Sequence, residues 1–145
     1  MATKNKTITF FTPKTTSGNG AILIDAGISA GFPSPADDFK ETRISLDDEL
    51  ITNKDATFFA KVSGQSMIGA GLDDNDLLVV DRSLEPENNK IAVCFLEGEF
   101  TVKRLRVEGD TVWLQPENPD YPVIKITEEI DLVIWGIVTS VIKKV

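Results

Sequence analysis

Hydrophobic residues in the second half of the chain fall into short runs that are rich in branched and aromatic side chains. Turn-forming segments such as Glu97-Gly98-Glu99 and Glu108-Gly109-Asp110 separate these runs. Runs of this length and composition are typical of β-strands. The predicted strands cover residues 57–62, 77–80, 91–96, 99–107, 111–114, 123–126 and 132–142. The sequence therefore predicts a mostly β fold made of several short, twisted strands.

The first third of the chain carries weaker signals. Residues 1–20 are rich in Thr, Lys, Asn and Gly and have little apolar surface to bury, so we expect a mobile N-terminal arm there. The two prolines within residues 33–35 favour extended backbone. Ser45, followed by Asp48 in the capping position, predicts a short helix over residues 47–51.

Length and charge narrow the classes of function. The chain has 145 residues, of which 41% are hydrophobic, which is enough for one buried core. The formal net charge is -8, and residues 1–20 contain lysines but no acidic residue, so the remainder is more acidic still. An acidic body argues against direct, sequence-specific DNA binding. Any link to nucleic acid is therefore expected to pass through a protein partner.

The chain contains no histidine. It therefore cannot form a Ser-His-Asp triad, a Cys-His dyad or a histidine-containing zinc site, and we expect neither a metal nor a cofactor. The single cysteine, Cys94, has apolar neighbours, cannot form a disulfide within the chain and fits a reducing cytosol. No stretch approaches the roughly 18 apolar residues of a membrane span, so we expect a cytoplasmic protein.

A candidate nucleophile lies in the segment Ser63-Gly64-Gln65-Ser66-Met67, which follows a predicted strand. Gly64 permits backbone geometry that a side chain would block. Such a turn can expose the Ser66 hydroxyl and direct the backbone N–H groups of Gln65 and Ser66 at a developing oxyanion. An ordinary polar loop is the alternative interpretation of this segment.

A candidate general base lies on the predicted strand at residues 99–107. Alternation places Lys103 on the same face as Leu105 and Val107. A lysine amine has a pKa of about 10.4 in water, and desolvation can lower this value by roughly 3 to 5 units. A neutral Lys103 can accept the Ser66 proton, as in Ser-Lys acyl-transfer enzymes. A solvated lysine on an edge strand is the alternative.

Four sequence blocks together resemble the LexA/UmuD self-cleaving serine peptidase family. These blocks are GFPSPA at residues 31–36, SGQSMI at residues 63–68, DLLVVD at residues 76–81 and GEFTVKRL at residues 98–105. Their order and spacing resemble the family over roughly residues 27–143, and the resemblance is closest to the UmuD branch. The serine and the lysine of the family fall on Ser66 and Lys103.

The resemblance implies a mostly β, LexA/UmuD-type peptidase domain that forms a homodimer and receives its own N-terminal arm in the active site. By position, the bond that is cut is Ala30-Gly31. Residues 1–30 would then be the removed arm, and residues 31–145 the peptidase and dimerisation domain. UmuD proteins often have Cys before the Gly, whereas this chain has Ala, as LexA does. The segment before residue 27 does not resemble the family.

The resemblance also implies a role in the DNA-damage (SOS) response. In the family, a RecA filament on single-stranded DNA activates cleavage, and the shortened product joins a UmuC-like subunit of a translesion DNA polymerase. Two other functions stay open. The chain could be a non-catalytic interaction module of a polymerase complex in which the dyad is unused. It could also be a processing peptidase that acts on other proteins, which the lack of a membrane anchor disfavours.

Two further patterns have simpler interpretations. The segment Ser140-Val141-Ile142-Lys143 matches the S-x-x-K motif of penicillin-binding enzymes but lacks the companion motifs, and we expect it to end a strand. The acidic cluster Asp73-Asp74-Asn75-Asp76 lacks the spacing of a calcium-binding loop, and we expect a solvated turn.

Overall fold

The computed structural model describes residues 8–14, 21–24 and 41–145. The chain divides into two compact units. We call residues 1–13 with 53–145 the sheet unit, and residues 14–52 the hairpin unit. Each unit is described by itself below.

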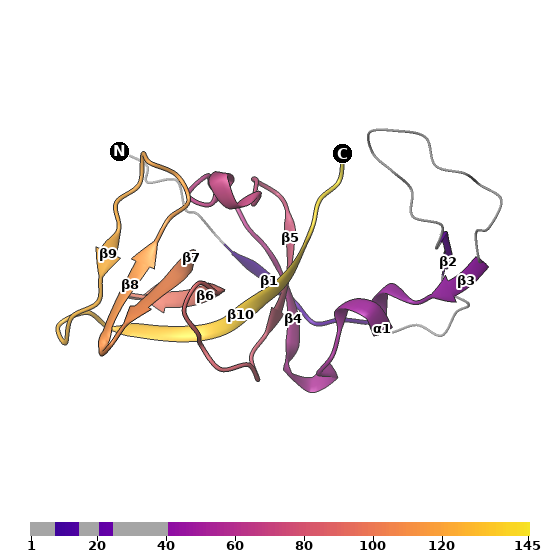
Figure 1. The fold of residues 1–145 in the computed structure, drawn as a ribbon, viewed down its shortest axis with the longest axis horizontal. Coiled ribbons are helices and arrows are strands. Elements are labelled where there is room, and N and C mark those ends of the chain that lie inside the picture. The colour runs from indigo at the N-terminus through magenta and orange to yellow at the C-terminus, as the bar shows by residue number, and fades with distance from the viewer. Residues whose placement is uncertain (1–7, 15–20, 25–40) are drawn as a thin grey trace. The chain divides into compact units, whose positions relative to one another are not determined.

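The sheet unit contains one eight-stranded antiparallel sheet (Figure 1). In spatial order its strands are β1 (Thr9–Phe11), β4 (Thr57–Lys61), β5 (Leu77–Asp81), β10 (Leu132–Ile142), β6 (Ile91–Leu96), β7 (Glu99–Glu108), β8 (Thr111–Gln115) and β9 (Ile124–Lys125). Two short 3-10 helices, η1 (Lys54–Ala56) and η2 (Ile68–Ala70), lie in the connections. The long strand β10 pairs with β6 over residues 132–137 and with β5 over residues 137–142. It therefore joins the two halves of the sheet.

The mostly β prediction is confirmed. Each predicted strand is present, and the ends differ from the predicted ends by one residue at most. The predicted ranges 91–96 and 132–142 coincide with β6 and β10. Short apolar runs between turn formers therefore located the sheet well.

Strand β1 was not predicted, because it lies in the segment that we expected to be a mobile arm. It pairs with β4 in antiparallel register, with Phe10 opposite Ala60. The Phe10 ring packs against Trp135 and Phe100, with ring centroids 4.4 and 4.8 Å apart. These aromatic contacts explain why a strand of three residues docks on the sheet edge.

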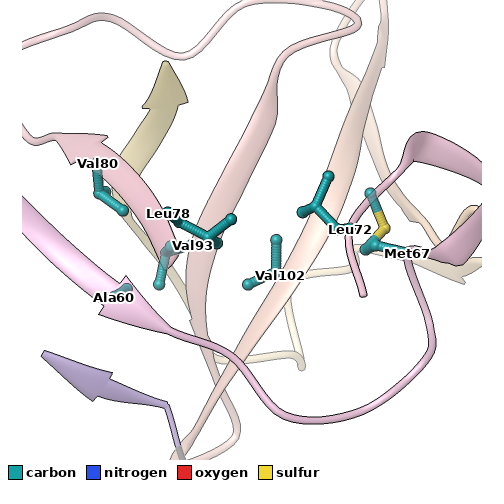
Figure 2. Packing of buried hydrophobic residues seen from close by; sticks show 7 residues of the cluster. All are labelled: Ala60, Met67, Leu72, Leu78, Val80, Val93 and Val102. Carbon is teal, nitrogen blue, oxygen red and sulfur yellow. The ribbon is translucent and has the colours of Figure 1, made fainter. Parts of the chain in front are cut away.

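The main hydrophobic cluster contains buried side chains from the four strands β4, β5, β6 and β7 and from the segment between β4 and β5. Its members are Ala60, Met67, Leu72, Leu78, Val80, Val93 and Val102. Figure 2 shows Met67 and Leu72 beside Val102, away from Val80. Met67 is 3% exposed, and its burial stabilises the fold by about 1.5–3 kcal/mol. Because Met67 directly follows Ser66, this burial also anchors the segment that carries the candidate nucleophile.

The hairpin unit contains strands β2 (Ala21–Ile24) and β3 (Glu41–Ile44) and helix α1 (Leu46–Leu50). The two strands pair in antiparallel register, with Ile24 opposite Glu41. The predicted scissile bond, Ala30-Gly31, lies outside the described residues, in the segment 25–40 that links these strands.

Helix α1 agrees with the predicted short helix except that it begins and ends one residue earlier. The Asp48 N–H donates a hydrogen bond to Ser45 Oγ at 3.5 Å, as the capping pattern predicts.

Among the described residues, no helix has both the length and the apolar character that a membrane span requires.

Candidate active site

The candidate nucleophile, Ser66, lies in the turn between β4 and η2. Gly64 begins this turn with a φ of 110°, a conformation that side-chain-bearing residues rarely adopt. Its N–H donates a hydrogen bond to Asp74 Oδ1 at 2.9 Å. The predicted glycine-dependent turn is therefore present, and its backbone is held in place before the chain reaches Ser66.

The candidate base, Lys103, lies on β7 opposite Ala92 of β6, and its side chain is buried with 7% exposure. Lys103 Nζ donates hydrogen bonds to Ser66 Oγ at 3.0 Å and to Thr101 Oγ1 at 2.7 Å. It also donates to the Val102 carbonyl at 3.2 Å. The fold thus brings together the two residues that the sequence analysis singled out.

The burial of Lys103 has a chemical consequence. Removal from water disfavours the charged ammonium more than the neutral amine. A neutral amine has a lone pair that can take the proton of a hydroxyl group at hydrogen-bond distance. The contact between Lys103 and Ser66 is therefore competent for nucleophile activation without histidine.

A pocket opens beside these two residues, and its lining is part apolar and part polar. The apolar lining residues are Ile8, Val62, Met67, Leu72, Phe100 and Val102. The polar lining includes Ser63, Thr101 and Tyr121 as well as Ser66 and Lys103. A pocket with both kinds of lining suits an extended peptide, whose side chains can contact the apolar residues and whose backbone can bond the polar groups.

The predicted oxyanion donors, the N–H groups of Gln65 and Ser66, belong to the same turn. Within the part of the chain that the structure describes, neither N–H donates to a protein acceptor. Both groups are therefore available to a substrate oxygen.

A second loop binds the turn that carries Ser66. The Asn118 side-chain amide donates to the Gln65 carbonyl at 2.9 Å, and the Glu117 N–H donates to the Ser66 carbonyl at 2.8 Å. Neither Asn118 nor Glu117 is among the residues predicted from the sequence. The only available signal was a turn-forming Pro116-Glu117-Asn118-Pro119 segment, which does not reveal its distant partner.

The acidic cluster at residues 73–76 is only partly the solvated turn that we expected. Asp76 is 5% exposed, and its Oδ2 accepts hydrogen bonds from Lys143 Nζ at 2.5 Å and from the Asp73 N–H at 2.8 Å. Lys143 Nζ also contacts Asp73 Oδ2 at 2.6 Å. The Asn75 N–H donates to the Val62 carbonyl at 2.9 Å, so the cluster ties the end of β10 to the chain before Ser66.

These contacts set the charge states in the cluster. Burial alone would raise the pKa of Asp76, but the hydrogen bonds from Lys143 and from the Asp73 N–H hold it below its ordinary value of 3.8. Hydrogen bonds to the carboxylates of Asp73 and Asp76 raise the pKa of Lys143 above its ordinary value of 10.5. The pair therefore stays ionised across the neutral and mildly alkaline range.

No cluster of metal-binding side chains is found among the described residues.

Cys94 is fully buried in the second hydrophobic cluster. Burial raises the pKa of its thiol to about 12, and Lys103, when it is protonated, opposes this only in part. A buried thiol with such a pKa is not a nucleophile at neutral pH.

Comparison with known proteins gives a family match. A family model described as Peptidase S24-like matches residues 22–139, a range that includes Ser66 and Lys103. The chain is 43% identical to Protein MucA of Salmonella typhimurium over 113 residues, which are 77% of this chain and 77% of MucA. It is 42% identical to Protein ImpA of Shigella flexneri over 115 residues, which are 79% of this chain and 78% of ImpA.

The similarity extends to a repressor. The chain is 37% identical to the LexA repressor of Thiobacillus denitrificans over 127 residues, which are 87% of this chain and 63% of the repressor.

Proposed function

The chain belongs to the Peptidase S24-like family, as its resemblance to LexA and UmuD predicts, and from this premise we propose that it is a serine peptidase that cuts its own chain once. The proposed nucleophile is the Ser66 hydroxyl, and the proposed general base is the Lys103 amine. The proposed scissile bond is Ala30-Gly31, so that the product is the chain from Gly31 onward.

The observation that carries this proposal is the 3.0 Å contact between Lys103 Nζ and Ser66 Oγ at a pocket, in a chain that has no histidine. A serine hydroxyl is a weak nucleophile unless a base removes its proton. The buried amine of Lys103 is such a base.

Acylation begins with Lys103 in its neutral form. Ser66 Oγ attacks the carbonyl carbon of Ala30 while its proton moves to Lys103 Nζ. The negative charge that develops on the carbonyl oxygen is stabilised by the N–H groups of Gln65 and Ser66. Lys103 then gives the proton to the nitrogen of Gly31, the carbon–nitrogen bond breaks, and Ala30 remains as an ester on Ser66.

Deacylation uses the same base. A water molecule attacks the ester carbon and gives a proton to Lys103 Nζ. The ester bond then breaks, and Lys103 returns the proton to Ser66 Oγ. The products are a carboxylate at Ala30 and an unchanged Ser66 and Lys103.

The register of β2 with β3 supports the proposal that the bond is presented for cleavage. Ile24 pairs with Glu41, so the two described residues that flank the segment with the proposed bond are neighbours. The proposed bond belongs to the hairpin unit, whereas Ser66 and Lys103 belong to the sheet unit. Cleavage therefore requires a hairpin unit to dock on a sheet unit, either of the same chain or of a second copy.

We further propose a cytoplasmic role in the SOS response, which rests on the resemblance to UmuD. In this role a RecA filament on single-stranded DNA activates cleavage. The shortened protein then acts as a homodimer and joins a UmuC-like translesion polymerase subunit. The competing function is a non-catalytic module of such a complex, in which Ser66 and Lys103 are never used.

One incubation separates these functions. The purified full chain is held at pH 7 to 10, with and without RecA, nucleotide and single-stranded DNA, and every product is identified by mass spectrometry. We expect a single new N-terminus at Gly31, in the wild-type chain but not in a Ser66→Ala variant. An intact chain under all these conditions would favour the non-catalytic module, and cuts in RecA would favour a processing peptidase.

A further inference from the structure

Two residues of a distant loop, Glu117 and Asn118, form hydrogen bonds with the turn that carries Ser66. These bonds orient the backbone N–H groups of the turn. We infer that Asn118 is a positioning residue for the oxyanion hole, because it fixes the peptide group whose N–H belongs to Ser66. The inference rests on the proposed function, since an oxyanion forms only if Ser66 attacks a carbonyl.

The orientation of the Asn118 amide is fixed by its two partners. Its Nδ2 donates to the Gln65 carbonyl at 2.9 Å, and its Oδ1 accepts from the Asp120 N–H at 3.0 Å. A carbonyl only accepts and a backbone N–H only donates, so a flipped amide would lose both bonds. Asn118 therefore presents its donor to the Gln65 carbonyl.

The carbonyl of Gln65 and the N–H of Ser66 belong to one planar peptide group and point in opposite directions. Holding the carbonyl therefore aims the N–H. The Ile68 N–H also donates to the Gln65 carbonyl, but at a longer distance of 3.3 Å. Asn118 supplies the shorter of these two bonds, and it is the one that comes from outside the turn.

Glu117 holds the next peptide group, the one between Ser66 and Met67. Its N–H donates to the Ser66 carbonyl at 2.8 Å, and its own carbonyl accepts from the Gly69 N–H at 2.6 Å. This close approach requires glycine, because a Cβ at position 69 would lie 2.5 Å from the Glu117 carbonyl oxygen. Successive peptide groups on both sides of the Ser66 side chain are thus held by one loop.

The gripping loop is itself tied to the strand that carries the base. The Glu117 carboxylate forms an ion pair with Arg104, which directly follows Lys103 on β7. Arg104 Nη1 also donates to the Asn89 carbonyl at 2.6 Å. The strand that carries the candidate base is therefore bonded to the loop that holds the nucleophile turn, and this supports their relative positions.

The test compares Asn118→Ala with Asn88→Ala in the full chain. Asn88 is the control because its side chain also bonds the backbone of another segment, accepting from the Val107 N–H on β7 at 2.8 Å instead of bonding the turn that carries Ser66. We expect Asn118→Ala to cleave itself roughly tenfold more slowly than wild type, because a misaligned oxyanion donor loses part of its effect. Asn88→Ala should cleave at the wild-type rate, and the pH dependence should be the same in all three proteins.

A second readout separates the oxyanion hole from docking of the hairpin unit. A small fluorophosphonate labels an active serine by forming a bond from Ser66 Oγ to phosphorus, while the hydroxyl proton passes to Lys103 Nζ and fluoride leaves, and it needs no hairpin unit. We expect Asn118→Ala to slow labelling and self-cleavage by similar factors. If the Asn118→Ala variant were labelled at the wild-type rate, or if its pH profile were shifted, Asn118 would not be a positioning residue.

The outcomes also distinguish this inference from the proposed function. If the wild-type chain is neither labelled nor cleaved, both the proposed function and the role of Asn118 are rejected. If wild type and Asn118→Ala are labelled and cleaved at equal rates, only the role of Asn118 is rejected. If Asn118→Ala fails to fold, Asn118→Asp replaces it, because Asp keeps the acceptor for the Asp120 N–H, lacks the donor to the Gln65 carbonyl and adds one negative charge there. A wild-type rate in Asn118→Asp would equally reject the inference.

Discussion

Lys103 Nζ lies 3.0 Å from Ser66 Oγ, although 37 positions separate the two residues along the chain. The relationship depends on two independent anchors. Lys103 is held in register by β6, and Ser66 is held by the buried Met67 that follows it. The distance between nucleophile and base is therefore set by the register of the sheet and by its core.

The rate of self-cleavage should rise with pH. The reaction needs the neutral amine of Lys103, so the rate should increase by up to about tenfold per pH unit while the ammonium predominates. The measurement is the first-order loss of intact chain between pH 7 and 10. A rate that stays flat over this range would contradict the assignment of Lys103 as base.

The contact between Lys143 and Asp76, which ties the end of β10 to the chain before Ser66, persists over the pH range of this assay. The pKa of Lys143 is raised above 10.5, so the stability that its contact with Asp76 contributes is present below pH 10.5 and is lost only above it. A Lys103→Ala variant provides the control, because its rate should be near zero at every pH. A rate increase in that variant would point to another base.

Thr101→Val should slow self-cleavage. The Thr101 hydroxyl lies 2.7 Å from Lys103 Nζ, and Val has a similar shape but offers no oxygen. Without this partner the amine is less well directed at Ser66, and we expect a loss of roughly tenfold. Thr139→Val is the matched control, since the Thr139 hydroxyl bonds the Val79 carbonyl at 3.3 Å, away from the pocket. Equal rates in the two variants would assign no positioning role to Thr101.

The sequence predicted the position of Lys103 only as far as alternation allows. Period-two alternation places the residue on a strand face, but both faces of a sheet can be covered, so it does not decide burial. Burial of Lys103 came from contacts with a turn that begins after β4, and such contacts depend on the whole fold. The strands themselves were predictable because their apolar runs and turn residues are local features.

The features that were missed are non-local or short. Strand β1 has three residues, too few for a period, and its docking depends on Trp135 and Phe100 far along the chain. Asn118 and Asp76 looked like ordinary turn residues. Their roles depend on partners in other parts of the sequence, namely Gln65 and Lys143.

Asp76→Asn should destabilise the sheet unit in a pH-dependent manner. Asp76 is buried and bonded to Lys143, so its loss should lower the free energy of unfolding by about 1–3 kcal/mol at pH 7. Because the folded pKa of Asp76 lies below 3.8, this stability is present above pH 3.8 and is lost as the pH falls further. The difference from wild type should therefore shrink in urea unfolding experiments near pH 3.

Asp73→Asn is the control for that experiment. Asp73 also contacts Lys143, but its side chain is 56% exposed, so its loss should cost less than about 1 kcal/mol. Equal effects of the two substitutions would show that burial of Asp76 does not strengthen its contact with Lys143.

Phe10→Ala should destabilise the sheet unit although it lies in the arm that the proposed cleavage removes. The substitution deletes ring contacts with Trp135 and Phe100, and we expect a loss of about 1–3 kcal/mol in the free energy of unfolding. The chain with Phe10 and the Phe10→Ala variant would both carry Ser66→Ala, so that self-cleavage does not complicate the measurement of unfolding. Phe11→Ala is the control, because Phe11 is 47% exposed and its loss should have little effect.

A chain that begins at Gly31 lacks β1, so it should be less stable than the full chain by at least the Phe10→Ala difference. The comparison uses urea unfolding of both chains, each with Ser66→Ala. In the full chain β1 is covalently linked to the sheet whose edge it forms, whereas after a cut at Ala30-Gly31 only the three residue pairs with β4 and the side-chain contacts of this short strand would hold it. Pairing of this length is marginal in water, so the released fragment should dissociate on dilution. Equal stability of the two chains would mean that β1 contributes nothing to the sheet edge.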